Sequence, residues 1–121
     1  MPRQLKSGAG WRLGWDTDAV EFCGLVGGED WAIELTQAEL DDFCRLAIQL
    51  AETMRQMQQE LMSEERITCE VESDRLWLEA EGFPHAYGLH LILLTGRKAE
   101  GSWSDAVVSE LIQAIQTFKV F

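Results

Sequence analysis

Histidine and cysteine are the residues of this 121-residue chain best suited to bind a metal or to act as nucleophiles, and they are few. His85 and His90 are the only histidines, and a spacing of five on a regular strand points them to opposite faces. They therefore cannot chelate one metal together. We expect His90 to sit among apolar neighbours with a hydrogen bond to the backbone, and we predict no metal site and no cofactor.

The cysteines give no sign of redox chemistry. Cys23, Cys44 and Cys69 are odd in number and lack CxxC spacing, which argues against a disulfide framework and fits a reducing compartment. We expect buried thiols that pack as small apolar side chains.

No other motif predicts catalysis. The glycines of GLVGGEDW, residues 24–31, do not follow the dinucleotide-binding fingerprint, because a strand comes next and not a helix. No serine stands in a nucleophile-elbow context. Asp41 and Asp42 are expected to be solvated charges. We therefore predict no catalytic residues and no enzyme activity.

The net charge of −11 limits the choice of partner. Such an acidic excess keeps a small protein soluble and repels phosphate backbones. Only Arg3, Lys6 and Arg12 gather in a stretch free of acids, so nucleic acid is disfavoured as a partner but left open. No run approaches the roughly 18 apolar residues of a membrane helix, and MPRQLKSGAG lacks the apolar core of a signal peptide. We expect a cytoplasmic protein with no membrane contact.

The stretch GWRLGWD, residues 10–16, could be a stacking platform for nucleobases or a strand of the core. Trp11, Leu13 and Trp15 alternate and so share one face of a strand, whereas Arg12 lies on the other. A stacking platform would mix aromatic and cationic side chains on one exposed surface. We therefore expect both indoles to face the core and Arg12 to face outwards alone.

Apolar residues alternate along six segments, the one just described and five others, which is typical of strands. The predicted strands are 11–15, 20–26, 31–35, 67–71, 76–80 and 85–95. A flexible stretch is expected at 96–101.

Two helices are predicted, one after each set of three strands. Thr36 and Glu39 have the spacing of a capping box, and an apolar seam with heptad spacing follows. The seam comprises Leu40, Phe43, Ala47, Leu50, Met54, Met57 and Leu61. Ser102 and Asp105 repeat the capping spacing at the start of the second helix. Its apolar face is formed by Val107 or Val108 with Leu111, Ile112, Ile115 and Phe118.

The hairpin of the second half carries most of the candidate contact residues. With Ser73-Asp74 as a two-residue turn, cross-strand pairs Glu72–Arg75 and Arg66–Glu81 would form on an acidic outer face. Trp77 lies in that face, and we expect it to be at least partly exposed. The residues that we predict to contact a partner protein or nucleic acid are Arg12, Arg75 and Trp77.

Three stretches, GWRLGWD, GLVGGEDWAIELT and ELDDFCRL, resemble the signature segments of a small cyanobacterial family of unknown function. The resemblance extends over essentially the whole chain. It implies a fold grouped with the Whirly-type transcriptional regulators that bind single-stranded DNA, with two strand-rich units paired in one chain as a pseudo-dimer. The lysine-rich strand motif of Whirly proteins is absent, and the hairpin face is acidic. The shared fold therefore does not transfer DNA binding to this chain.

Together these observations predict an α+β fold for a single domain, residues 1–121. A strand-strand-strand-helix unit would occur twice, at about 9–63 and 66–121, giving two antiparallel sheets and two long helices. The function expected first is a non-catalytic interaction module that binds an unknown protein partner or self-associates. The alternative is a protein that binds single-stranded nucleic acid or regulates transcription.

Overall fold

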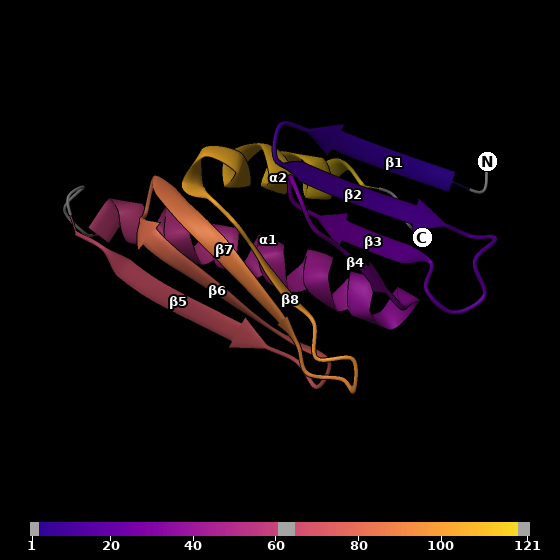
Figure 1. The fold of residues 1–121 in the computed structure, drawn as a ribbon. Helices are drawn as coiled ribbons and strands as arrows, with labels where there is room; N and C mark the ends of the chain where they lie inside the picture. The colour runs from indigo at the N-terminus through magenta and orange to yellow at the C-terminus, as the bar shows by residue number, and fades with distance from the viewer. Residues whose placement is uncertain (1–2, 61–64, 119–121) are drawn as a thin grey trace.

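The computed structural model describes residues 3–60 and 65–118, in which four strands precede each of two helices (Figure 1). The elements are β1 (Arg3–Gly8), β2 (Trp11–Asp16), β3 (Gly24–Gly27), β4 (Ala32–Leu35), α1 (Gln37–Glu60), β5 (Ile67–Glu72), β6 (Leu76–Phe83), β7 (Ala86–Leu93), β8 (Glu100–Trp103) and α2 (Asp105–Thr117). The predicted α+β class with antiparallel sheets is confirmed, but the prediction of three strands before each helix is wrong. β1 and β8 were missed because RQLKSG and EGSW each hold one large apolar side chain and show no alternation.

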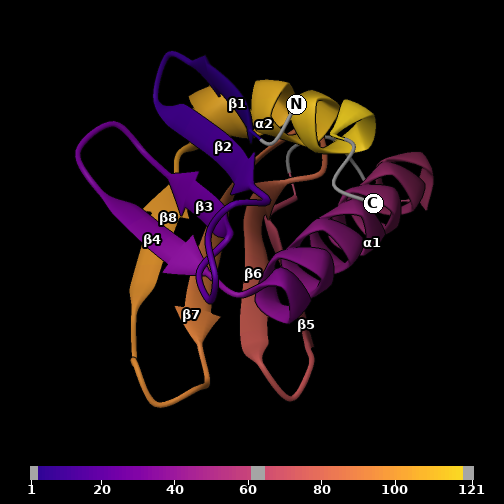
Figure 2. The ribbon, with the colours of Figure 1, turned by 90° about the vertical axis from the view of Figure 1, so that its right-hand side faces the viewer.

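Each set of strands forms one antiparallel sheet whose strand order follows the chain, β1-β2-β3-β4 and β5-β6-β7-β8. Both helices lie on the same side of the two sheets (Figures 1 and 2). α1 contacts β5 and β6 as well as β3 and β4, α2 contacts β7 and β2, and the helices contact each other. The two helices therefore cover the inner faces of both sheets together, and β4 meets β8 where the sheets adjoin.

The start of α1 and its apolar seam are as predicted. The Glu39 N–H donates to Thr36 Oγ1 (3.2 Å) and the Thr36 N–H donates to Glu39 Oε1 (2.9 Å), so the capping box is formed. Of the predicted seam, Met57 is half-buried and Leu61 lies outside the described residues. The buried members are Leu40, Phe43, Ala47, Leu50 and Met54.

The GWRLGWD stretch is a core strand, β2, as predicted. Trp11 and Leu13 are buried, and Trp15 is half-buried against the same core. The Trp11 indole N–H donates to Glu110 Oε1 on α2 (2.6 Å), which ties the first sheet to the last helix. Arg12 points to the opposite face, where its guanidinium donates to the Trp31 carbonyl (2.8 Å).

The hairpin of β5 and β6 differs from the prediction in register. Glu72 lies opposite Trp77 and not opposite Arg75, so the two-residue turn falls one residue later than predicted. Ser73 sets this turn, because its hydroxyl oxygen accepts hydrogen bonds from the N–H groups of Arg75 (3.1 Å) and Leu76 (3.3 Å).

The register error is an even number of residues, so it leaves the inner and outer faces of the hairpin as predicted. The Arg66–Glu81 ion pair forms, with 2.5 Å between Nη2 and Oε2. Arg75 does not pair with Glu72 as predicted, because the shifted turn directs its guanidinium to Asp42 on α1 (3.3 Å).

Residues 17–22 form a loop. The strand that was predicted at 20–26 therefore starts later, at Gly24. The Asp16 N–H donates to the Cys23 carbonyl (2.7 Å), which closes the loop before β3 starts at Gly24. Val20 lies in this loop and is fully exposed.

The predicted capping pair of α2 is also wrong. Ser102 belongs to β8, a strand whose first two residues, 100–101, were predicted to be flexible chain. The helix starts at Asp105, and Ser104 occupies the N-cap position without a side-chain hydrogen bond. The predicted apolar face of α2 is nevertheless buried, as the spacing of its residues requires.

Two tryptophans fill the junction between the sheets. The rings of Trp31 and Trp103 lie 5.0 Å apart between centroids, and the Trp103 indole N–H donates to the Gly27 carbonyl (2.9 Å). Gly101 of β8 lies directly under the Trp31 ring, where an added Cβ would overlap the ring carbons.

Gly101→Ala is therefore expected to displace Trp31 and to lower the free energy of unfolding by about 1–3 kcal/mol, the usual cost of overpacking. Urea unfolding followed by tryptophan fluorescence measures this change. Gly96→Ala is the matched control, because a Cβ at Gly96 meets no atom within 4 Å. Equal stability of the two variants would show that the Trp31 ring does not depend on Gly101.

Candidate functional site

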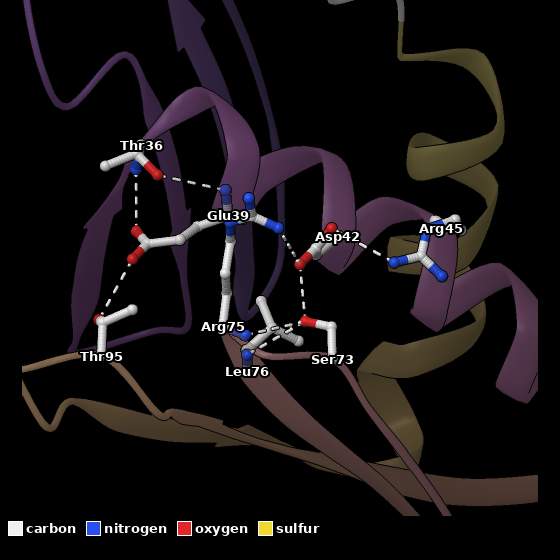
Figure 3. A network of polar contacts seen from close by, with 8 residues as sticks. All are labelled: Thr36, Glu39, Asp42, Arg45, Ser73, Arg75, Leu76 and Thr95. Carbon is white, nitrogen blue, oxygen red and sulfur yellow. Dashed lines mark hydrogen bonds and ion pairs between the residues drawn. The ribbon is translucent and has the colours of Figure 1, made fainter.

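Two buried carboxylates on α1 hold the loops of the second sheet (Figure 3). Glu39 accepts hydrogen bonds from Arg97 Nη2 (2.6 Å) and Thr95 Oγ1 (3.2 Å), both in the loop between β7 and β8. Asp42 accepts from Ser73 Oγ (2.6 Å) and Arg75 Nη1 (3.3 Å) in the turn between β5 and β6. The prediction that Asp42 is solvated is therefore wrong, because its partners Ser73 and Arg75 lie more than thirty residues away and the sequence around it gives no sign of them.

Both carboxylates remain ionised at neutral pH. Burial alone would raise the pKa of Glu39, but the hydrogen bond from Arg97 and that from the Thr36 N–H outweigh it and lower the pKa below 4.5. Burial opposes the same change at Asp42, where the hydrogen bonds from Ser73 and Arg45 lower the pKa. Ionised carboxylates with these partners suit a structural clamp and not a proton donor.

Glu39→Gln is expected to lower the free energy of unfolding at pH 7 by about 1–3 kcal/mol, because Arg97 loses its charged acceptor. Since the folded-state pKa of Glu39 lies below its ordinary 4.5, the carboxylate stabilises the fold above that pH. The stabilisation is lost as the pH falls through the folded-state value. Unfolding measured between about pH 7 and pH 3 should thus show the difference from wild type shrinking with acid.

The control for this prediction is Glu29→Gln, an exposed carboxylate in the turn between β3 and β4. Its effect on stability should stay within about 0.5 kcal/mol at every pH. A Glu39→Gln variant as stable as this control would contradict a role for Glu39 as a clamp.

The outer face of the second sheet is acidic. Carboxylates from β5, β6 and β8 surround a half-buried centre formed by Trp77, His90 and Ile92. We call this surface the acidic face; its carboxylates are Glu70, Glu72, Glu79, Glu81 and Glu100. Across the strands, Glu70 lies directly opposite Glu79, a like-charge pairing that destabilises a sheet.

His90 belongs to this face, so the prediction of an apolar, backbone-bonded His90 is wrong. Its Nε2 lies 2.9 Å from Glu100 Oε2, and its ring contacts Trp77 edge to face with 5.7 Å between centroids. The run of apolar residues around His90 suggested a buried position. Because β7 alternates, Leu89 and Leu91 point inwards, whereas His90 shares the outer face with Ile92.

The three predicted contact residues are not brought together into one site. Trp77 is half-buried on the acidic face, in keeping with the partial exposure predicted for it. Arg75 is directed to Asp42, and Arg12 lies on the other sheet, bound to the Trp31 carbonyl.

A groove of about 460 Å³ lies between the helices and the turn that joins β6 to β7. Its lining is mainly neutral, with glutamine amides from both helices beside His85 and Tyr87. Burial raises the pKa of the Tyr87 hydroxyl, so the group is a neutral donor at physiological pH. Arg55 and Asp105 also line the groove, so it offers hydrogen bonds and one charge of each sign.

Within residues 3–60 and 65–118, no three His, Cys, Asp or Glu side chains are grouped so that they could hold a metal ion. Burial, with a smaller effect of Asp41, raises the pKa of Cys44 to about 12, so this thiol is protonated and unreactive. In the part of the chain that is described, neither helix has the length and apolar character needed to span a bilayer.

Comparison with other proteins gives a family but no activity. A family profile described as a domain of unknown function, DUF1818, matches residues 6–118. A crystal structure of a protein with unknown function from the DUF155 family, from Prochlorococcus sp. NATL2A, is 31% identical in sequence with a TM-score of 0.90. The match covers 95% of this chain and 97% of that one. No curated protein matches significantly. The expected resemblance to a family of unknown function is thus confirmed, a similar structure comes from a cyanobacterium, and the chain belongs to the DUF1818 family.

Proposed function

We propose that this protein is a non-catalytic, cytoplasmic protein-binding module whose acidic face takes a lysine- or arginine-rich segment of a partner. The observation that carries the proposal is the composition of that face. Five carboxylates surround Trp77, and the cation placed beside them, Arg66, is already paired with Glu81.

The register of the sheet supports a cationic partner. Glu70 and Glu79 face each other across β5 and β6, and a lysine or arginine placed between them would relieve their repulsion. Trp77 offers an aromatic face on which a cationic side chain can stack. An apolar centre with a charged rim is also the usual composition of a protein interface.

Single-stranded nucleic acid is the second candidate. It is favoured by the order of four strands and a helix that occurs twice, with both helices covering both sheets. This is the arrangement expected of a Whirly-like pseudo-dimer, and we include that relationship in the proposal. Against DNA binding stand the inward indoles of β2 and the engagement of Lys6 with Thr117 Oγ1 (2.6 Å) and of Arg12 with Trp31.

Fluorescence anisotropy with a labelled oligolysine peptide at about 50 mM salt tests the proposal. The double variant Glu70→Gln/Glu79→Gln should bind roughly tenfold more weakly than wild type, because it removes two carboxylates from the centre of the acidic face. Trp77→Ala should also weaken binding through loss of the stacking surface.

The matched control is Glu29→Gln/Glu60→Gln, which removes the same charge from exposed positions outside the acidic face. If both double variants lose affinity equally, the peptide senses only net charge and the proposed face is wrong. Binding of a mixed-sequence single-stranded oligonucleotide that weakens steeply with added salt, without oligolysine binding, would favour the second candidate.

A further inference from the structure

The outer face of the first sheet carries a hollow of about 200 Å³. Register places Leu5, Gly14, Leu25 and Glu34 side by side across the four strands. Because Gly14 has no side chain, the sheet surface is depressed between the two leucines. Phe22 forms a wall of the hollow and is held under the Arg97 guanidinium, 4.5 Å from its ring centroid.

The surroundings of the hollow are unusually apolar for exposed surface. Among the described residues, the large apolar side chains that are exposed are Leu5 (58%), Val20 (104%) and Leu94 (48%). Leu5 lines the hollow, and Val20 directly follows Ala19, which also lines it. Leu5, one of these three side chains, therefore lines a side-chain-sized depression, and exposed apolar side chains at a depression mark contact surfaces.

The charges at the hollow select the partner. Asp16 and Glu34 line it, and Asp18 and Glu21 stand on the adjoining loop. The nearby cations are engaged elsewhere, since Arg97, which lies over Phe22, pairs with Glu39, and Arg12 donates to the Trp31 carbonyl. A second copy of this chain would bring the same carboxylates together in a protein of net charge −11, so self-association is disfavoured here. A segment with an apolar side chain between cations satisfies both the hollow and its rim.

We propose that this hollow binds a peptide segment in which one bulky aliphatic side chain is flanked by lysines or arginines. The aliphatic side chain fills the space over Gly14, between Leu5 and Leu25, and the flanking cations meet Asp16 and Glu34. The contact lies on the first sheet and is separate from the acidic face, so it goes beyond the proposed function and either can fail alone.

The experiment compares two labelled peptides, a lysine peptide with a central leucine and the same peptide with glycine in its place. Wild type should bind the leucine peptide roughly five- to tenfold more tightly, because burial of an aliphatic side chain adds to the charge attraction. Gly14→Val should abolish this preference by filling the hollow. The added Cβ would stand 3.2 Å from Leu5 Cδ1, the end of an exposed side chain that can move, so we expect the variant to fold.

Gly96→Val is the matched control, since it adds the same side chain where no atom lies within 4 Å, and it should keep the preference. Thermal unfolding of each variant verifies that it is folded. Equal affinity of wild type for both peptides, or a preference that survives Gly14→Val, would overturn the proposal. Sedimentation of wild type as a dimer that Gly14→Val dissociates would also overturn it, because a second copy would then occupy the hollow.

Discussion

Neither sheet of this protein can bury its inner face with the helix that follows it in the chain, and the rest of the structure depends on this constraint. α1 covers strands of both sheets, and so does α2. Side-chain hydrogen bonds hold each helix to the sheet other than the one just before it in the chain. The Trp11 indole reaches Glu110 on α2, while Glu39 and Asp42 on α1 bind the loops of the second sheet.

This constraint explains which polar groups are available for function. The buried carboxylates, Glu39 and Asp42, are occupied in holding α1 to the loops of the second sheet. Arg75 and Arg97 are directed to these two acids. Both arginines are therefore engaged, and on the acidic face five carboxylates stand beside a single arginine among the described residues, Arg66, which pairs with Glu81.

Local signals in the sequence predicted the parts of the fold that local physics determines. The Thr36–Glu39 spacing and the apolar seam of α1 are set within one helix, and the inward indoles of β2 follow from strand alternation. β1 and β8 gave no such signal, because each holds one large apolar side chain among polar residues and glycine and so shows no alternation. Their place is fixed by pairing with β2 and β7.

The candidate surfaces were predictable to a smaller degree. The partial exposure of Trp77 and the acidity around it followed from alternation, which survives a register error of two residues. The burial of Asp42 and the position of the turn at Ser73 could not be predicted, because Ser73 and Asp42 stabilise each other across 31 residues of chain. The hollow over Gly14 requires the order of all four strands, including β1.

The bond between Trp11 and Glu110 spans 99 residues and has a consequence for biosynthesis. While the ribosome is still making the second half, the first sheet has no α2 to cover Trp11 and Leu13. Contacts between such distant segments close late and slow the search for the native state. The nascent first half therefore presents apolar surface with Trp11 and Leu13 until α2 has been made, as expected of a client for chaperones that bind emerging chains.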